Sequence, residues 1–154
     1  MSNIRNTLFL AAALIGSLAG TQAQAAPADT IQARQKNLKE MGEAFKTVRD
    51  QVKLSSPDMA AIQAAGQTIK KHSEAMSTWF PKGTGPEVGV KTAAKPEIWS
   101  DAAGFETART NFVAAAAKFA EVTKSGDKAT VSAGIGPMGG ACKGCHDKYR
   151  VKED

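Results

Sequence analysis

Apolar residues recur along most of the chain at alternating spacings of three and four positions, which gathers them on one side of an α-helix. The pattern predicts four helices, over residues 29–53, over residues 57–78, from Pro96 to a turn at 125–127, and over residues 128–151. No stretch alternates apolar and polar residues as a β-strand would. We therefore expect an all-α fold, an antiparallel four-helix bundle.

Capping and helix-breaking residues mark the ends of these helices. Ser56 followed by Pro57 is typical of an N-cap and a first helical position, and Asp127 is a candidate N-cap for the last helix. Pro137 lies inside that last helix, in a glycine-rich run over residues 134–140. A proline there removes a backbone hydrogen bond, so we expect a kink or a local break.

Two features indicate that the bundle encloses something. The connection over residues 80–95 is rich in Gly, Pro and Thr and is longer than most loops in helical bundles. The second and third helices also place alanine at many inward positions. Helices with such small core residues either pack very closely or leave room for a ligand.

The first 25 residues differ from the rest of the chain. Arg5 precedes an apolar run over residues 8–18, and Ala23-Gln24-Ala25 offers a small-residue cleavage site. This arrangement predicts a secretory signal peptide, so the folded domain is residues 26–154. No later stretch is apolar enough to span a bilayer, and we therefore expect an exported protein without a membrane span.

Charge adds little to this picture. The chain has 20 Lys and Arg against 15 Asp and Glu, and both signs are scattered along it. There is no basic patch interleaved with aromatic residues, which argues against a nucleic-acid partner. A basic face that steers an acidic redox partner stays open.

The two cysteines form a C-x-x-C-H motif, Cys142-Lys143-Gly144-Cys145-His146, which is the attachment pattern of c-type haem. In that chemistry the two thiols add to the haem vinyl groups, and the histidine ligates the iron. Cys142 and Cys145 lie on the apolar stripe of the last helix, so both should point inward. We predict one covalently bound haem c, with His146 as the metal ligand.

Three other interpretations of the motif are weaker. A redox-active pair of the thioredoxin kind usually opens a helix after a strand, whereas this motif is near the end of a helix. A zinc site needs four ligands, and His72 is the only other histidine. A plain disulfide leaves His146 unexplained. A haem-free thiol–disulfide enzyme remains as the alternative.

Arg34 lies on the apolar stripe of the first helix, where an unpaired guanidinium is costly. Its stem could be buried while its head reaches water. Its guanidinium could instead pair with a haem propionate, which suits a bidentate donor. Both interpretations stay open on the residues alone.

The second axial ligand of the iron decides between electron transfer and gas binding. Electron carriers usually fill this position with Met or His, whereas an open position admits a small molecule. His72 is the only further histidine, and a lone histidine on this helix is more typical of a surface residue. Met41, Met59, Met76 and Met138 all lie on or beside apolar stripes, so we expect them to pack in the core.

Four segments together resemble the cytochrome c′ family of c-type cytochromes. The first is residues 34–42, RQKNLKEMG, and the last is residues 142–150, CKGCHDKYR. The loop at residues 80–85, FPKGTG, and Ile98-Trp99 followed by Phe105 give further similarity. The resemblance covers nearly all of the chain after residue 25 and implies a four-helix bundle that carries one haem c.

The resemblance also implies roles for single residues. Arg34 matches the family's propionate-binding arginine, and Arg150 matches an arginine on the side of the iron-ligating histidine. Leu38 matches the position that faces the vacant side of the iron, where low-spin members of the family have an iron-ligating methionine. A leucine there implies a five-coordinate, high-spin haem.

The function implied by the resemblance is that of a periplasmic haem protein. It binds nitric oxide and carbon monoxide, transfers single electrons to a partner that the sequence does not identify, and forms a homodimer in many members. No acid–base pair is apparent, so we expect no enzymatic turnover. The alternative is a low-spin electron carrier in which Met41, almost one turn past Leu38, ligates the iron.

Overall fold

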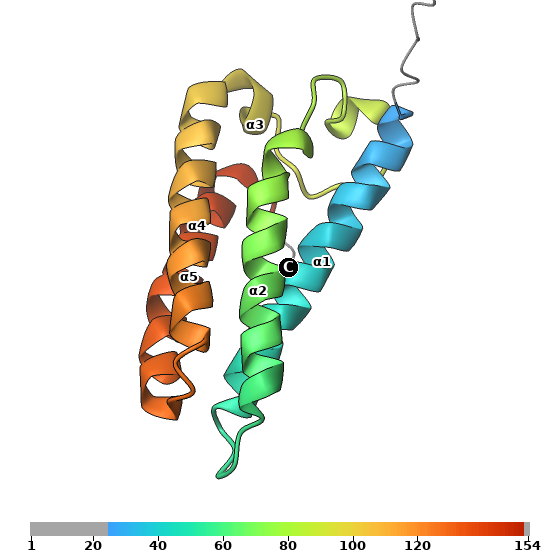
Figure 1. The fold of residues 1–154 in the computed structure, drawn as a ribbon. Helices are drawn as coiled ribbons and strands as arrows, with labels where there is room; N and C mark the ends of the chain where they lie inside the picture. Colours follow the sequence, from blue (N-terminus) through green and yellow to red (C-terminus); the bar gives the residue numbers. More distant parts are fainter. Residues whose placement is uncertain (1–24, 153–154) are drawn as a thin grey trace, which may run out of the picture.

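Four long helices build the fold, as the computed structural model of residues 25–152 shows (Figure 1). They are α1 (Pro27–Gln51), α2 (Met59–Ala75), α4 (Ala102–Thr123) and α5 (Lys128–Tyr149). Shorter pieces connect them: the 3₁₀ helices η1 (Met76–Thr78) and η2 (Pro86–Val88), and one helical turn, α3 (Glu97–Ser100). The antiparallel four-helix bundle expected from the sequence is confirmed.

The predicted signal peptide lies outside the described residues, apart from Ala25. Within residues 25–152, every helix is too short or too polar to cross a lipid bilayer.

One predicted helix start is wrong and one predicted helix is divided in two, and in each case an aspartate explains why. Asp58, not Ser56, is the N-cap of α2, and its carboxylate accepts a hydrogen bond of 2.9 Å from the backbone nitrogen of Ala61. The helix predicted from Pro96 is divided at Asp101, whose backbone is not helical (φ −116°, ψ 55°). The carboxylate of Asp101 instead caps α4 by accepting from the nitrogen of Gly104 at 3.3 Å.

For the last helix, the predicted N-cap is correct but the predicted break in the middle is not. Asp127 is its N-cap and accepts a hydrogen bond of 2.7 Å from the nitrogen of Thr130, as predicted. The predicted break at Pro137 is wrong, because α5 runs through it without interruption. Pro137 and Ala133, whose carbonyl loses its usual helical partner, are both exposed, so water can satisfy that carbonyl.

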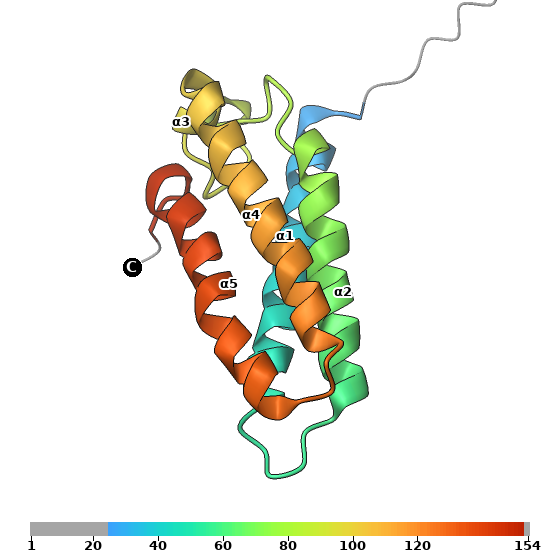
Figure 2. The same ribbon diagram turned by 60° about the vertical axis from the view of Figure 1, so that its left-hand side comes forward.

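The helices pack in the order α1, α2, α4 and α5, each against the next (Figures 1 and 2). Gly66 lets α2 approach α4 closely, because a Cβ atom at this position would lie 2.1 Å from Oγ1 of Thr123. Between α1 and α5, by contrast, the described residues make no extensive packing contact. The bundle is therefore closed on three sides and open on the side between its first and last helices.

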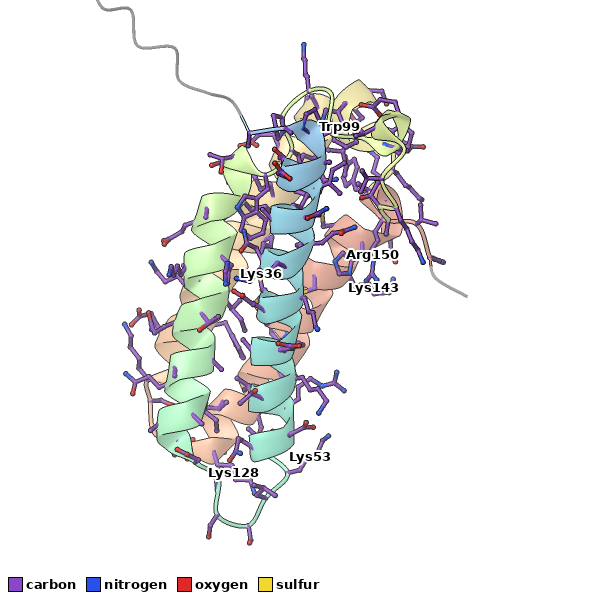
Figure 3. All side chains as sticks on the ribbon, turned by 90° about the vertical axis from the view of Figure 1, so that its right-hand side faces the viewer. Lys36, Lys53, Trp99, Lys128, Lys143 and Arg150 are labelled. Atoms are coloured by element: carbon purple, nitrogen blue, oxygen red, sulfur yellow. The ribbon has the colours of Figure 1, made fainter. Side chains whose placement is uncertain are left out.

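Residues 79–96, which we call the strap, cross the open side at one end of the bundle. The strap is bonded to α5, because the carbonyl of Ala93 accepts from the nitrogen of Val151 at 2.8 Å. The nitrogen of Lys95 also donates to the carbonyl of Tyr149 at 3.0 Å. Figure 3 shows Trp99 at this end of the bundle, and Lys53 and Lys128 at the other.

Candidate functional site

A cavity of about 890 Å³ lies between α1 and α5, beneath the strap. This volume is in the range of sites that hold cofactors. Most of the side chains that enclose it are apolar, and they come from all the long helices. The principal ones are Leu38, Met41, Phe45, Ile69, Met76, Phe112 and Met138.

One wall of the cavity is the last part of α5, where Cys142, Cys145 and His146 all reach the cavity. One helical turn separates Cys142 from His146, so the three side chains lie on one side of the helix. Both thiols are free and partly buried. The structure therefore confirms that the two cysteines point inward and brings the whole C-x-x-C-H motif to one surface.

The ionisation of these groups suits binding better than thiol catalysis. Burial raises the pKa of both the Cys142 and the Cys145 thiols. Catalytic cysteines need a lowered pKa, so this environment argues against the thiol–disulfide alternative. Burial, followed by the charge of Arg150, lowers the pKa of His146 and so favours its neutral imidazole, the form that ligates metals.

Arg34 stands on the opposite wall, in α1, and only 2 % of its surface is exposed. The interpretation in which its head reaches water is therefore wrong. Its four terminal N–H groups instead donate to strap oxygens. The acceptors are the carbonyl of Trp79 (3.4 Å), Oγ1 and the carbonyl of Thr84 (3.2 and 3.0 Å), and Oγ1 of Thr92 (3.3 Å).

Further contacts stabilise the positive charge of the buried Arg34 guanidinium. It lies over the ring of Phe80, 4.7 Å from the centroid, which is a favourable cation–π distance. Burial lowers the pKa of Arg34 and the nearby carboxylate of Glu87 raises it, but an arginine stays protonated at neutral pH. A positive charge is thus held at the strap end of the cavity.

Leu38 follows Arg34 by one turn and is partly buried on the same cavity wall. Met41 also lines the cavity, and it belongs to the hydrophobic core together with Met76 and Met138. Met59 packs against that core. The expectation that all four methionines pack in the core is confirmed.

His72 is not among the residues that line the cavity. Its side chain is 13 % exposed, and its Nε2 atom lies 3.1 Å from a carboxylate oxygen of Glu40 on α1. Its ring also packs edge-on against Trp79, with centroids 5.9 Å apart. His72 thus joins α1 to α2 and is less exposed than the surface residue that the sequence favoured.

A zinc site also lacks support in the structure. Among the described residues, no three His, Cys, Asp or Glu side chains are grouped so that they could hold a metal ion.

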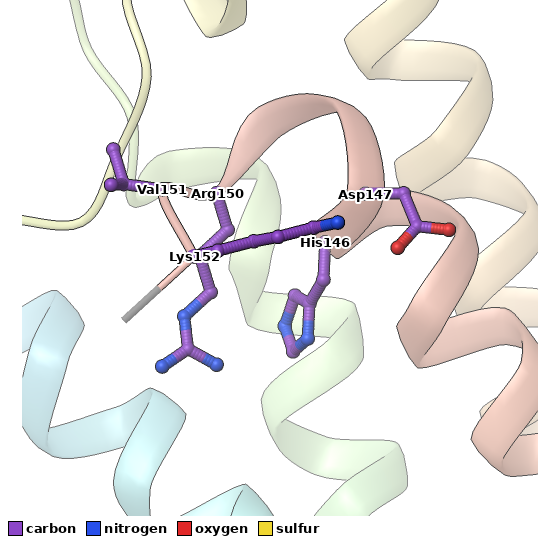
Figure 4. Close-up of a pocket in the computed structure, with 5 residues that line it drawn as sticks. All are labelled: His146, Asp147, Arg150, Val151 and Lys152. Atoms are coloured by element: carbon purple, nitrogen blue, oxygen red, sulfur yellow. The ribbon is translucent and has the colours of Figure 1, made fainter. Parts of the chain in front are cut away.

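Arg150 lies at the end of α5, where it lines both the large cavity and a smaller one of about 310 Å³. The smaller cavity is also bounded by His146, Asp147, Val151 and Lys152. In Figure 4 the imidazole of His146 and the guanidinium of Arg150 point to the same side of the chain, and Asp147 points away from both. A cation therefore lies beside the histidine, where the sequence placed it.

Sequence reasoning missed the contact that fixes the end of α5. Tyr149 lines the cavity, and its hydroxyl donates a hydrogen bond of 2.8 Å to Asp101. Asp101 also forms an ion pair with Lys148 and caps α4. No local sequence pattern predicts this contact, because Asp101 and Tyr149 are 48 residues apart. The contact ties the turn that carries His146 to the start of α4.

The cavity has the features that a covalent haem requires. Two thiols and a neutral imidazole share one wall, the interior is apolar, and a buried cation marks one end. A porphyrin ring needs the apolar interior, its vinyl groups need the thiols, and its propionates need the cation. The residues present therefore fit the group.

Comparison with known proteins agrees with this geometry. Residues 29–150 match the family described as Cytochrome C′. The chain is 39 % identical over 127 residues to cytochrome c′ from Rubrivivax gelatinosus, which covers 82 % of this chain and 97 % of that protein.

Solved structures give the same result. A cytochrome c′ with ligand-controlled dimer dissociation is 32 % identical, with a TM-score of 0.80 over 84 % of this chain and 100 % of that one. A leucine-to-alanine variant of cytochrome c′ from Alcaligenes xylosoxidans, in complex with nitric oxide, is 34 % identical, with a TM-score of 0.73 over 84 % of this chain and 99 % of that one. The chain therefore belongs to the cytochrome c′ family and binds one covalently attached haem c.

Proposed function

We propose that this protein is a periplasmic cytochrome whose haem iron is five-coordinate and high-spin, binds nitric oxide and carbon monoxide, and exchanges single electrons with a redox partner. The observation that carries the proposal is the pairing of the two cavity walls. The α5 wall offers Cys142, Cys145 and His146, whereas the α1 wall faces them with Leu38.

Cys142 and Cys145 are the proposed attachment points, and His146 the proposed iron ligand. When bound, the haem supplies a one-electron couple and an iron atom that can take a diatomic gas. The neutral imidazole of His146 is ready to bind iron, because burial and the charge of Arg150 both oppose its protonation. The bond from Tyr149 to Asp101 holds the same turn in place.

Leu38 governs the other side of the iron in this proposal. A leucine cannot ligate iron and cannot donate a hydrogen bond, so it does not favour a ligand that needs polar support. Nitric oxide and carbon monoxide need little such support and can displace a flexible apolar side chain. Nitric oxide complexes of variants of the Alcaligenes xylosoxidans relative support nitric oxide as a ligand of this haem.

Arg34 and Arg150 supply positive charge on the two walls. Arg34 is buried at the strap end and is proposed to favour haem propionates there. Arg150, beside His146, is proposed to act on that histidine and on any ligand that binds on its side of the iron. No catalytic residue is proposed.

The proposal also covers the location of the protein, in the periplasm, and its assembly, as a homodimer. The predicted signal peptide over residues 1–25 supports a periplasmic location. The relative with ligand-controlled dimer dissociation supports a homodimer for this chain as well.

The absorption spectrum of the purified ferrous holoprotein, recorded without added ligand, tests the proposal. A broad high-spin spectrum that changes on addition of carbon monoxide is expected. A sharp, split low-spin spectrum would overturn the five-coordinate assignment. Haem that leaves the chain on a denaturing gel would overturn the attachment at Cys142 and Cys145.

A low-spin electron carrier is the second candidate, because Met41 lines the cavity less than one turn past Leu38. Replacing Met41 with leucine separates the two candidates. If Met41 is not a ligand, Met41→Leu leaves the ligand-free spectrum unchanged. Conversion from a low-spin to a high-spin spectrum would establish the second candidate.

A further inference from the structure

Six cationic side chains line the large cavity, against a single carboxylate, Glu43. The cations are Arg34, Lys39, Lys46, Lys91, Arg109 and Arg150. A haem brings two propionates into such a site, and a carboxylate at the edge of an apolar cavity needs a cation or water. The question is which of these cations is free to pair with a propionate.

Three of the six already pair with a carboxylate on their own helix. The ammonium of Lys39 lies 3.7 Å from a carboxylate oxygen of Glu43, and Lys46 pairs with Asp50. Nε of Arg109 donates to Glu106 at 2.8 Å. These contacts compete with a propionate for the same donors.

The two other arginines are held in different places. All four terminal N–H groups of Arg34 donate to strap oxygens, so this side chain cannot grip a propionate in bidentate fashion without releasing the strap. Arg150 directly follows α5, the helix that carries the thiols, and lines the smaller cavity together with His146.

Lys91 differs from the other five. Its side chain is exposed at the edge of the cavity, and within the described part of the chain its ammonium has no carboxylate partner. Its backbone is nevertheless fixed, because its carbonyl accepts from Nε2 of Gln35 at 2.8 Å. The next two residues are held as well: Thr92 by Arg34 (3.3 Å) and Ala93 by Val151 (2.8 Å).

The exposed ammonium of Lys91 thus extends from a backbone that is fixed at the cavity edge. A haem joined to the two thiols would turn its vinyl edge toward α5, and its propionates, which lie on the opposite edge of the ring, would point away from that helix. Lysine suits a carboxylate at a solvent boundary, because its ammonium is strongly hydrated and its stem is flexible. We infer that Lys91 is the ion-pair partner of a haem propionate, an assignment that rests on the proposed attachment of haem to Cys142 and Cys145.

The division of labour between Arg34 and Lys91 follows from these contacts. Arg34 anchors the strap and contributes a buried charge, and the strap presents Lys91 to the propionate. The other ionisable groups that face the cavity are Lys39, Glu43 and Lys46 on α1, Arg109 on α4, and His146, Tyr149 and Arg150 on or after α5.

The reduction potential of the holoprotein, measured as a function of pH, tests the assignment. The reduction potential changes with pH where a propionate takes up or loses a proton, and we call this change the propionate step. A nearby cation lowers the pKa of a propionate. Removal of the Lys91 charge in Lys91→Gln should therefore move the propionate step to higher pH, by about 0.5 to 1 pH unit. Lys82→Gln is the matched control, because Lys82 is an exposed strap lysine that does not line the cavity. Lys91→Arg keeps the charge and should leave the step in place.

A second measurement uses the unaltered protein. Salt screens an exposed ion pair. Raising the ionic strength should therefore move the propionate step of the native protein to higher pH and leave the step of Lys91→Gln nearly unchanged. The assignment is overturned if Lys91→Gln behaves as Lys82→Gln does, or if salt leaves the native step in place. Loss of covalent haem in the native protein would instead overturn the proposed function.

Discussion

Leu38 and Arg34 lie one turn apart on α1, and both reach the same cavity. Residues four positions apart share one side of a helix, so a single stretch of α1 supplies a charged end and an apolar middle. The middle faces the helix that carries Cys142 and His146. The proposed function assigns to one side chain of this stretch, Leu38, the control of what the iron can bind.

Replacing Leu38 with methionine should convert the haem to a low-spin state. The thioether would occupy the open iron position, and a gas would have to displace it. If the methionine-bound form reaches about 99 % of the population, carbon monoxide affinity falls about 100-fold, because only the remaining fraction is competent to bind. Absorption spectra and carbon monoxide titrations measure both effects.

Leu38→Ala is the matched control for that change. It shortens the side chain without supplying a ligand, so the spectrum should stay high-spin. A high-spin spectrum for Leu38→Met as well would mean that residue 38 does not face the iron.

At the scale of helices, aspartates cap the starts of α2, α4 and α5. Asp58, Asp101 and Asp127 each accept a hydrogen bond from a backbone nitrogen of the turn that follows. These nitrogens have no partner inside the helix, and a carboxylate also meets the positive end of the helix dipole. The three caps define where the connections before α2, α4 and α5 end.

The N-cap of α2 offers a direct comparison between two neighbouring residues. Asp58→Ala removes the bond to the nitrogen of Ala61 and should lower the free energy of unfolding by about 1 kcal/mol. Ser56→Ala should change it by less than about 0.5 kcal/mol, because Ser56 is not the cap. Urea unfolding followed by circular dichroism gives both values. Equal losses for the two variants would count against Asp58 as the cap.

The helices could be predicted from the sequence because their apolar period is local, and so could the haem motif, whose Cys142 and His146 lie within five residues. The division at Asp101 could not, since it depends on Tyr149 and Lys148. The position of Lys91 at the cavity edge could not be predicted from neighbouring residues in the sequence either. Its place at the cavity edge depends on Gln35, 56 residues away.

At the scale of the whole molecule, the site lies where the bundle is not closed by its own side chains. The first and last long helices face each other across the cavity. The strap is bonded to both, through Arg34 and Gln35 on α1 and through Tyr149 on α5. A haem attached to α5 would occupy the cavity in front of α1. It would give both helices an apolar contact that they do not make with each other.

The same connections predict how the molecule responds to acid. Hydrogen bonds from Lys148 and then Tyr149 hold the pKa of Asp101 below its ordinary value of 3.8. A carboxyl whose pKa is lower in the folded state stabilises the fold fully above its unfolded pKa, and this contribution is lost as the pH falls through the folded value. Asp101 therefore helps to hold the end of α5 at neutral pH and ceases to do so in strong acid.

Asp101→Asn tests this dependence in the holoprotein. The variant should unfold at a lower urea concentration than the native protein at pH 7. The difference should shrink below about pH 4, where the carboxyl of the unfolded chain takes up a proton while the folded one, with its lower pKa, is still ionised. Some acid sensitivity will persist, because the pKa values of Glu106, Asp127 and Asp147 are also lowered by their partners. Lys148→Gln removes one of the two side chains that donate to Asp101. Its urea midpoint of unfolding at pH 7 should lie between those of the native protein and Asp101→Asn. A difference between native and Asp101→Asn midpoints that is the same at pH 7 and at pH 3 would show that the ionised carboxylate of Asp101 does not stabilise the fold.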